Sequence, residues 1–276
     1  MLVSLREITQ QAADKNCAVA GFNVFGYEDA SAVIRAAEKL NAPVILMSNK
    51  DAVDYMPLEF YADLFCRLAR NAKVPVCIHL DHAKSYELIA RAIKAGYTSV
   101  MYDGSQLPLE ENIRNTKEVV KLAKALDISV EAEIGSVGYS DPNIKIKGVY
   151  TKPEEAEIFA RETGVDILAV SIGNVHRMEK QGATIQYDLL KEIQEVVPAP
   201  IVVHGSTGIL DEDMKKLITY RIGKVNIGTA LRMAFGSTLR EEMERKPNAF
   251  DRLELLKSTI DAVEEAAYNK LKLLGF

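Results

Sequence analysis

Short apolar runs alternate with amphipathic stretches along nearly the whole chain of 276 residues. Eight runs are predicted to be strands, and most are apolar at every position, as is typical of parallel strands covered on both faces. The predicted strands are Ala18–Asn23, Val44–Ser48, Val76–Leu80, Ser99–Tyr102, Ser129–Glu133, Ile167–Ser171, Ile201–Val203 and Lys224–Ile227. The pattern therefore predicts a series of strand–helix units.

The segments between the predicted strands carry helix signals. Ser85 is expected to begin one helix and Gly96 to end it. Thr151-Lys152-Pro153-Glu154 has the pattern of a capping box with an early proline, and Asp211 is expected to cap a further helix. After the eighth strand, two helical stretches at about 229–244 and 250–274 are separated by Pro247.

Eight such units in about 230 residues predict a (β/α)8 TIM barrel over residues 1–276, one α/β domain with extra C-terminal helices. An open doubly wound sheet is the alternative, but it usually has fewer strands and often a G-x-G-x-x-G motif after the first. The connection from Gly135 to Tyr150 is unusually long and glycine-rich. It is predicted to be a lid over the catalytic face, and a simple surface excursion is the alternative.

Composition narrows the setting in which the protein works. The 39 acidic and 34 basic side chains give a net charge of −5, and no basic stripe indicates nucleic acid. Cys17, Cys66 and Cys77 lie far apart and form no C-x-x-C motif, which is typical of a reducing cytosol. The first residues lack a signal-peptide pattern, and no apolar run has membrane-spanning length. We therefore expect a cytoplasmic protein that binds neither nucleic acid nor membrane.

All four histidines lie where an apolar run ends: His79, His82, His176 and His204. Neutral imidazole is the commonest protein ligand for metals, so His82, His176 and His204 are predicted to form a zinc site with an open position. Zinc bound to a carbonyl and a neighbouring hydroxyl would act as a Lewis acid and stabilise an enediolate. His79 is expected to support a ligand rather than to bind the metal.

Four further polar residues are candidates for roles near this metal. Asp81 can exchange a proton with a metal-bound hydroxyl, or it only orients imidazole. Glu131 and Glu133 share one strand face, so they support the ligands, bind another cation, or form a helix-facing ion pair. Asn226 can form a hydrogen bond to a developing enolate oxygen.

Two segments rich in glycine and hydroxyl groups follow the seventh and eighth predicted strands. They are Gly205-Ser206-Thr207-Gly208 and Gly228-Thr229. Barrels often bind phosphate at these two loops, so both segments are predicted to do so. Lys180, four residues after His176, is expected to reach the same anion, and a solvated lysine is the alternative.

Six motifs together resemble the class II, zinc-dependent ketose-bisphosphate aldolases of the fructose- and tagatose-bisphosphate type. They occur in the family's order and cover nearly the whole chain. The motifs are Ile78-His79-Leu80-Asp81-His82, Val100-Met101-Tyr102-Asp103-Gly104-Ser105, Val130-Glu131-Ala132-Glu133-Ile134-Gly135, Ile172-Gly173-Asn174-Val175-His176, His204-Gly205-Ser206-Thr207-Gly208 and Val225-Asn226-Ile227-Gly228-Thr229.

The resemblance implies reversible cleavage of a ketose (bis)phosphate to dihydroxyacetone phosphate and an aldehyde, through a zinc-stabilised enediolate. It implies that the three histidines bind Zn²⁺ and that Asp81 moves the proton of the C4 hydroxyl. It further implies a Na⁺ or K⁺ ion at the phosphate loops, and a homodimer or homotetramer in which Arg232 reaches a neighbour's site. The residues that would hold the dihydroxyacetone phosphate end are Lys180, Gly205, Ser206, Asn226 and Thr229.

The chain also departs from the family pattern. Arg177 and Gln106 stand where the family usually has glycine and histidine, and Gly228 replaces an acidic residue or alanine. The predicted lid contains no glutamate, which leaves Asp141 as the candidate lid acid. These changes point to an altered acceptor side, and the alternative substrate is a ketose 1-phosphate with another anionic tail, such as a sulfonate. The candidates for binding this distal group are Ser48, Lys50, Arg177 and Arg232.

Two other functions remain open from the sequence. A zinc-hydroxide hydrolase barrel often has an H-x-H pair on its first strand, but Ala18–Asn23 contains no histidine. A non-catalytic barrel subunit that keeps the metal is favoured by the missing lid glutamate. The intact set of Asp81 and three histidines argues against it.

Overall fold

The computed structural model describes residues 1–276 apart from residues 142, 144, 145 and 147. Eight parallel strands form a closed barrel in which each strand pairs with its sequence neighbours and the first closes against the last. The predicted TIM barrel is therefore confirmed. The barrel strands are β1 (Val19–Asn23), β2 (Val44–Ser48), β3 (Val76–Ala83), β4 (Ser99–Tyr102), β5 (Ser129–Ile134), β7 (Ile167–Val170), β9 (Ile201–Val203) and β10 (Ile222–Ile227).

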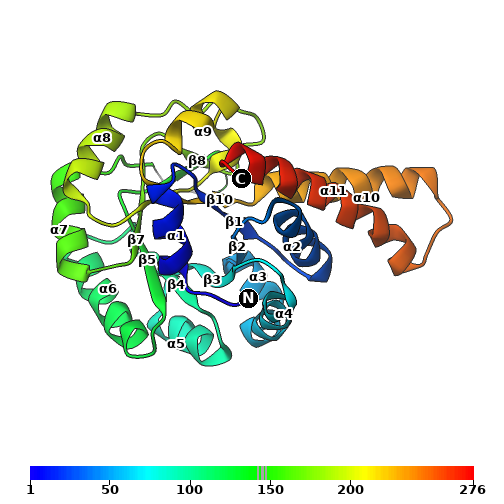
Figure 1. The fold of residues 1–276 in the computed structure, drawn as a ribbon, viewed down its shortest axis with the longest axis horizontal. Helices are drawn as coiled ribbons and strands as arrows, with labels where there is room; N and C mark the ends of the chain where they lie inside the picture. Colours follow the sequence, from blue (N-terminus) through cyan, green and yellow to red (C-terminus); the bar gives the residue numbers. More distant parts are fainter. Residues whose placement is uncertain (142, 144–145, 147) are drawn as a thin grey trace.

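Helices surround the barrel on its outer side (Figure 1). They are α2 (Tyr27–Leu40), α3 (Lys50–Tyr55), α4 (Leu58–Asn71), α5 (Tyr86–Ala95), α6 (Leu109–Lys124), α7 (Pro153–Thr163), α8 (Tyr187–Val196) and α9 (Asp211–Leu217). The last two helices, α10 (Thr229–Arg245) and α11 (Arg252–Leu273), pack against each other and project from the barrel as an arm (Figure 1). Among the described residues, no helix combines the length and the apolar character needed to cross a bilayer.

Side chains of each strand alternate between two apolar layers. The outer layer fills the space between barrel and helices, and it includes Ile78 and Leu80 of β3. The inner layer lies inside the barrel, where Cys77 of the same strand packs with Met47. Helix α1 (Leu5–Asp14) adds Leu5 to this inner layer and lies across the amino-terminal end of the barrel (Figure 1). The interior toward the carboxyl ends of the strands is therefore left for polar side chains.

The helix beginnings agree with the sequence in part. The Ser85 side chain accepts a hydrogen bond from the Leu88 N–H, and Gly96 ends that helix, as predicted. The predicted capping box at Thr151 is wrong, because Lys152 is the N-cap and makes no side-chain cap bond. The Thr151 hydroxyl is instead buried and donates to the Ile134 carbonyl at 2.6 Å. This hydroxyl therefore ties the end of β5 to the helix entrance.

Two other helix boundaries differ from the predictions. Asp211 is the first helical residue of α9 rather than its cap, which is Leu210. Helix α1 was not predicted, although Ser4 caps it by accepting from the Glu7 N–H. Its ten residues form too short a segment to distinguish it from the flanking chain before its packing partners are known.

The long connection after β5 is partly ordered into a second, small sheet. Strand β6 (Gly138–Tyr139) pairs in parallel with β8 (Val175–His176). Ser136 pairs with Val149 as an isolated bridge, which brings the two ends of the connection together. The predicted lid from Gly135 to Tyr150 includes residues 142, 144, 145 and 147, which lie outside the described residues, so its closure stays a prediction.

Candidate metal centre and active site

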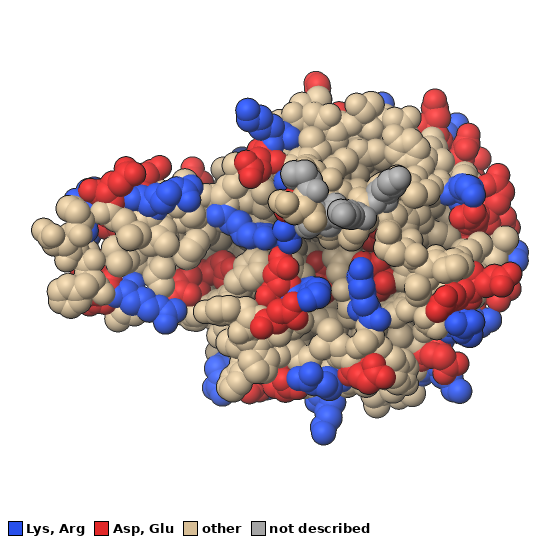
Figure 2. Space-filling view, turned by 180° about the vertical axis from the view of Figure 1, so that it is seen from behind, with Lys and Arg blue, Asp and Glu red and all other residues tan. Residues whose placement is uncertain are grey.

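A cavity of about 260 Å³ opens at the carboxyl ends of the barrel strands. Figure 2 views the molecule from the side of the long β5 connection, and acidic and basic side chains gather near the middle of that face. Most of the predicted site residues meet in the cavity wall although they are far apart in sequence. They are Lys50, Asp81, His82, His176, Arg177, Gly205, Ser206, Thr207, Asn226, Gly228, Thr229 and Arg232.

A bulge in β3 turns Asp81 and His82 toward this cavity. Leu80 pairs with Val100 but Ala83 pairs with Tyr102, so three steps on β3 face two on β4. His82 has a φ of 53°, in the left-handed region that side chains other than glycine seldom adopt. Successive strand residues normally point to opposite faces, and a bulge re-aims one of them. The bulge therefore lets two adjacent residues both line the cavity.

Three imidazole rings converge below the cavity: His82 and His176 line its wall, and the fully buried His204 ring lies against them, with ring centroids 4.7 and 5.5 Å away. His82, His176 and His204 each offer a ring nitrogen, and these atoms all lie within 4.8 Å of one another. The Nε2 atom of His82 and the Nδ1 atom of His204 are buried and have no hydrogen-bond partner among the described residues. A buried nitrogen without a partner is costly unless another group satisfies it. The donor set and its geometry therefore fit a zinc ion with a position left open for substrate.

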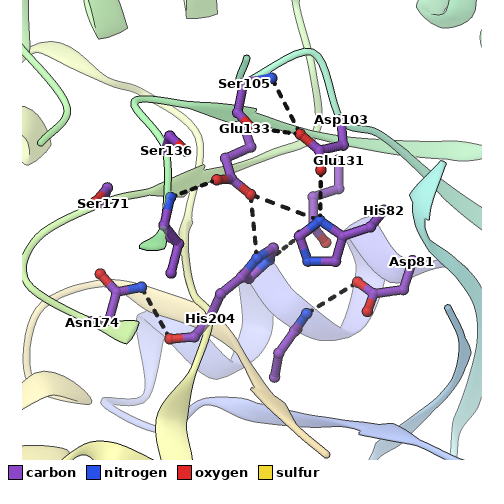
Figure 3. A network of polar contacts seen from close by, with 12 residues as sticks. Asp81, His82, Asp103, Ser105, Glu131, Glu133, Ser136, Ser171, Asn174 and His204 are labelled. Carbon is purple, nitrogen blue, oxygen red and sulfur yellow. Dashed lines mark hydrogen bonds and ion pairs between the residues drawn. The ribbon is translucent and has the colours of Figure 1, made fainter. Parts of the chain in front are cut away.

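The other ring nitrogen of two histidines is held by a carboxylate (Figure 3). His82 Nδ1 lies 2.9 Å from Asp103 Oδ2, and His204 Nε2 lies 3.0 Å from Glu131 Oε1. Carboxylates in these positions fix the ring orientation and the tautomer of metal-binding histidines. The nitrogens left without a hydrogen-bond partner among the described residues are His82 Nε2 and His204 Nδ1.

Glu133 reaches the same place from β5. Its Oε1 atom accepts from the Val137 N–H at 3.1 Å, whereas Oε2 lies 3.4 Å from His204 Nδ1 and has no hydrogen-bond partner in the part of the chain that the structure describes. With His82 and Asp103 it forms a second cluster that can hold a cation. Glu131 and Glu133 both lie inside the barrel, so neither forms the helix-facing ion pair that was the alternative.

The carboxylates make the base of the cavity attractive to positive charge. Burial opposes the protonation of His82, but Asp81, Asp103 and Glu133 together raise its pKa to about 10. Burial and the neighbouring His82 lower the pKa of His176 well below its ordinary value. The same carboxylates that favour a proton on His82 also favour a divalent cation, which can replace that proton.

Asp81 is fixed in the cavity wall by two amides. Its Oδ2 accepts from Asn23 Nδ2 at 2.9 Å, and its Oδ1 accepts from Asn226 Nδ2 at 3.1 Å. Burial alone would raise the pKa of Asp81, but His82, Lys224 and the other nearby bases lower it overall. The carboxylate is therefore ionised and ready to accept a proton. The Asn226 Oδ1 atom is buried without a partner among the described residues, so it can accept a hydrogen bond from a substrate hydroxyl.

The two loops predicted to bind phosphate lie next to each other. Gly205 has a φ of 65°, and a Cβ there would lie 2.3 Å from the Val175 carbonyl oxygen, so only glycine fits. The Ser206 hydroxyl donates to the Asn226 carbonyl at 2.6 Å and thereby joins the two loops. Thr229 begins helix α10, whose N-terminal N–H groups favour an anion.

Not all predicted residues reach the cavity. Ser48 is completely buried and its hydroxyl lies 2.5 Å from that of Tyr97, so it does not line the wall. Lys180 is exposed and lies outside the wall. Asp141 is outside it too, with Oδ2 at 3.7 Å from the Arg177 guanidinium. His79 is buried away from the cavity, where Nδ1 lies 2.8 Å from the Ser99 hydroxyl.

The rim of the cavity is cationic. Arg177 donates to Asp51 at 2.9 Å, and Arg232 approaches the same carboxylate at 4.0 Å. Lys50 also lines the wall and pairs with Asp54. Arg177 has a φ of 58°, the left-handed backbone that glycine adopts without strain. Two guanidinium groups thus share one carboxylate, which leaves positive charge for an anionic ligand.

The sequence analysis places Asn23 and Asp103 at the barrel mouth but gives them no role, and it does not single out Lys224 at all. The signal for Asn23 and Asp103 was their position at the carboxyl ends of predicted strands. Their partners, Asp81 and His82, are known only once the barrel brings β1, β3 and β4 together. Lys224 gave no signal, because a lysine near a strand end normally points to solvent.

The family profile described as fructose-bisphosphate aldolase class-II matches residues 3–276. The chain belongs to this family. The aldolase is 36% identical over 301 residues to the fructose-bisphosphate aldolase of Thermus caldophilus, covering 100% of this chain and 98% of the relative. It is 37% identical over 278 residues to the probable fructose-bisphosphate aldolase of Bacillus subtilis, covering 99% and 98% of the two chains.

Solved structures agree with this assignment. The aldolase shares 36% identity and a TM-score of 0.89 with the YdjI aldolase of Escherichia coli K12, covering 100% of this chain and 98% of the other. A fructose-1,6-bisphosphate aldolase structure from Coccidioides immitis gives 29% identity and a TM-score of 0.88, with coverage of 97% and 94%. The chain is thus a class II aldolase, a carbon–carbon lyase, and zinc dependence is general in this family.

Proposed function

We propose that this aldolase cleaves a ketose bisphosphate reversibly to dihydroxyacetone phosphate and an aldehyde, with zinc held by His82, His176 and His204. The observation that carries this proposal is the convergence of three imidazoles with two unpartnered, buried ring nitrogens. A bound zinc ion would supply Lewis acidity at the substrate carbonyl and hydroxyl. Asp103 and Glu131 hold two of the rings in the orientation that such binding requires.

In the cleavage direction, Asp81 takes the proton of the substrate's C4 hydroxyl. As the C3–C4 bond breaks, its electron pair stays on C3 of the dihydroxyacetone phosphate part, which takes up a proton there before release, and the C4 oxygen becomes the aldehyde oxygen. The amides of Asn23 and Asn226 keep both oxygens of the carboxylate in place for this transfer. Asn226 keeps one amide hydrogen and its buried oxygen for the substrate.

The dihydroxyacetone phosphate end binds at the joined loops of β9 and β10. Gly205, Ser206, Thr207, Gly228 and Thr229 all line the wall there, and backbone N–H groups at the start of α10 face the same space. A Na⁺ or K⁺ ion would organise these loops around the phosphate. Lys180 completes the phosphate site only if its exposed side chain turns into the cavity on binding.

A second candidate substrate is a ketose 1-phosphate whose distal end carries another oxyanion, such as a sulfonate. The specific observation is that Arg177 lines the cavity together with Lys50 and Arg232. Guanidinium groups bind planar and tetrahedral oxyanions through paired hydrogen bonds. Asp51, which now holds both arginines, would be displaced by the ligand.

The arm of α10 and α11 favours a homodimer or homotetramer. Phe250 is 95% exposed and Leu253 is 78% exposed at its tip, and Met243 is also exposed. Apolar side chains gathered on a projecting element are typical of a surface that another subunit covers. Arg232 lies in the first turn of α10 and lines this chain's own cavity rather than a neighbour's.

The test is a panel of ketose 1-phosphates and bisphosphates, with bound zinc measured on the same samples. We expect about one zinc per chain, and release of dihydroxyacetone phosphate that stops with a chelator and returns when zinc is added. Zinc binding without release from any ketose phosphate would favour a non-catalytic barrel. Release that a chelator does not change would contradict the metal-dependent mechanism.

A further inference from the structure

A layer of polar side chains lies inside the barrel between the apolar inner layer and the metal centre. It consists of His79 on β3, Ser99 on β4, Glu131 on β5 and Lys224 on β10, and all four are completely buried. Burying an ammonium group and a carboxylate is costly, and the cost is met only when the two groups are well paired. Glu131 already has a role as the partner of His204, whereas Lys224 has none in the proposed mechanism.

The geometry connects Lys224 to the metal centre through one carboxylate. Lys224 Nζ donates to Glu131 Oε2 at 2.5 Å, and it lies 3.4 Å from His79 Nε2. The other oxygen of Glu131 accepts from His204 Nε2 at 3.0 Å. The two oxygens of this carboxylate therefore face different partners, an ammonium group on one side and a histidine of the metal centre on the other.

The hydrogen bond from His204 Nε2 to Glu131 determines which form the other ring nitrogen, Nδ1, takes. Neutral imidazole carries one N–H, and when Nε2 uses it to donate to Glu131, Nδ1 presents its lone pair. That Nδ1 atom is buried and has no hydrogen-bond partner among the described residues, and one ring nitrogen of His204 lies within 4.8 Å of ring nitrogens of His82 and His176. Without Lys224, Glu131 would lose its cation and be free to rotate away from this orientation.

The side chain of Lys224 occupies space inside the barrel that a side chain at Gly21 would otherwise fill. A Cβ on Gly21 of β1 would lie 3.0 Å from the Lys224 Cε atom and 2.7 Å from the Met47 sulfur. Gly21 pairs with Asn226, two residues beyond Lys224 on β10. The absence of a side chain at Gly21 thus lets the lysine extend across the barrel interior to Glu131.

We propose that Lys224 is a positioning residue for the zinc site, which acts through Glu131 to hold His204 with Nδ1 toward the metal. This inference rests on the three-histidine zinc site proposed above. Lys224 does not line the cavity, and its ammonium group contacts Glu131 and His79. It fixes the carboxylate that fixes the imidazole.

The first experiment measures zinc affinity by competition with a chelator in Lys224→Met, Glu131→Gln and the double variant. Methionine keeps the length and apolar stem of lysine without its charge. We expect Lys224→Met to weaken zinc binding about 10–100-fold, the range for loss of a group that supports a metal ligand. In the Glu131→Gln background the same change should cost little, because the neutral amide needs no cation. Lys257→Met, at an exposed site on α11, is the matched control and should bind zinc like the wild type.

Several outcomes decide the question. Wild-type affinity in Lys224→Met, or an equal loss with and without Glu131→Gln, would overturn the proposal. If Lys224→Met folds only together with Glu131→Gln, the uncompensated carboxylate is the cause and the proposal stands. If His204→Ala binds zinc as tightly as the wild type, the three-histidine site itself is wrong, which is a separate failure.

The first part of a second measurement uses the wild type alone and so does not depend on a variant folding. The ¹⁵N spectrum of the zinc-loaded wild type should show His204 protonated on Nε2, with Nδ1 bound to the metal. Protonation on Nδ1 would overturn the proposed chain of contacts. In Lys224→Met we expect the Nε2 proton signal to broaden or disappear, which a purely packing role of the lysine would not cause.

Discussion

The base and the rim of the cavity are built in different ways. The side chains at the base, such as Asp81 and His204, come from barrel strands, are buried and have named partners for most of their polar atoms. Those at the rim, such as Arg177 and Lys50, come from loops and helix ends, and they pair with carboxylates that are half exposed. A buried polar group must be satisfied by fixed neighbours, whereas an exposed one can exchange its partner for a ligand. The base is therefore suited to the chemistry and the rim to the choice of substrate.

The largest effect should come from removing a ring at the base. His82→Ala, His176→Ala or His204→Ala should each abolish stable zinc binding and lower kcat/KM by about 10³-fold or more, since the metal supplies several kcal/mol at the reacting oxygens. Bound zinc and dihydroxyacetone phosphate release are measured on the same preparation. Tyr55→Ala, which removes an exposed ring on α3, is the control and should keep about one zinc per chain. Full zinc occupancy in two of the three alanine variants would contradict the proposed ligands.

A smaller loss should follow when the proton acceptor is changed and the metal site is left intact. Asp81→Asn should lower kcat by about 10²–10⁴-fold, the usual contribution of a positioned general acid–base group. Zinc content should stay at the wild-type level, because Asp81 bonds to two amides rather than to a histidine. Cleavage by this variant at the wild-type rate would show that another group takes the C4 proton.

A change at the rim should separate substrate choice from chemistry. Arg177→Gly should raise KM for the preferred phosphorylated ketose about 10–100-fold, the value of one hydrogen bond to a charged group. Hydrogen exchange at C3 of dihydroxyacetone phosphate should be unchanged, because the base of the cavity is untouched. Glycine adopts the φ of 58° at position 177 without strain, so the thermal stability of Arg177→Gly should be equal to that of the wild type or slightly higher.

An acceptor panel gives the decisive comparison for this variant. If Arg177→Gly and wild type use every acceptor aldehyde equally well, Arg177 does not select the substrate. A loss confined to acceptors with a distal anion would support the second candidate substrate described above.

The smallest effect concerns stability alone. The Ser171 N–H donates a hydrogen bond to Thr151 Oγ1 at 2.8 Å, and both residues are buried. Thr151→Val removes the acceptor and leaves this buried N–H without a partner. We expect a loss of about 1–3 kcal/mol in the free energy of unfolding, measured by urea denaturation, with little change in kcat. Thr219→Val, whose exposed hydroxyl donates to the Lys216 carbonyl, is the control and should cost less than about 0.5 kcal/mol. Equal losses would show that burial does not set the difference.

The base of the site was easier to predict than the rim. His82, His176 and His204 each follow an apolar run, and in a parallel barrel all strand ends of one kind meet at one mouth. Ser48 also follows such a run, yet its hydroxyl bonds to Tyr97 and it faces away from the cavity. Its outward direction follows from the alternation of side chains on β2, where the inward position is Met47. The end of a strand thus predicts location, but the side-chain direction depends on strand parity and bulges.

The order of apolar runs and helix signals in the sequence was enough to determine the eight-stranded barrel and the end at which its polar residues gather, and the six motifs were enough to indicate the family. Tertiary structure alone decided which nitrogen of His82 and of His204 is free, because that depends on Asp103 and Glu131 from other strands. It also decided that Lys224 is buried, because its ammonium group is paired with the carboxylate of Glu131, a residue far away in the sequence. Periodicity is a local property of the chain, whereas the pairing of buried charges is settled only when the barrel closes.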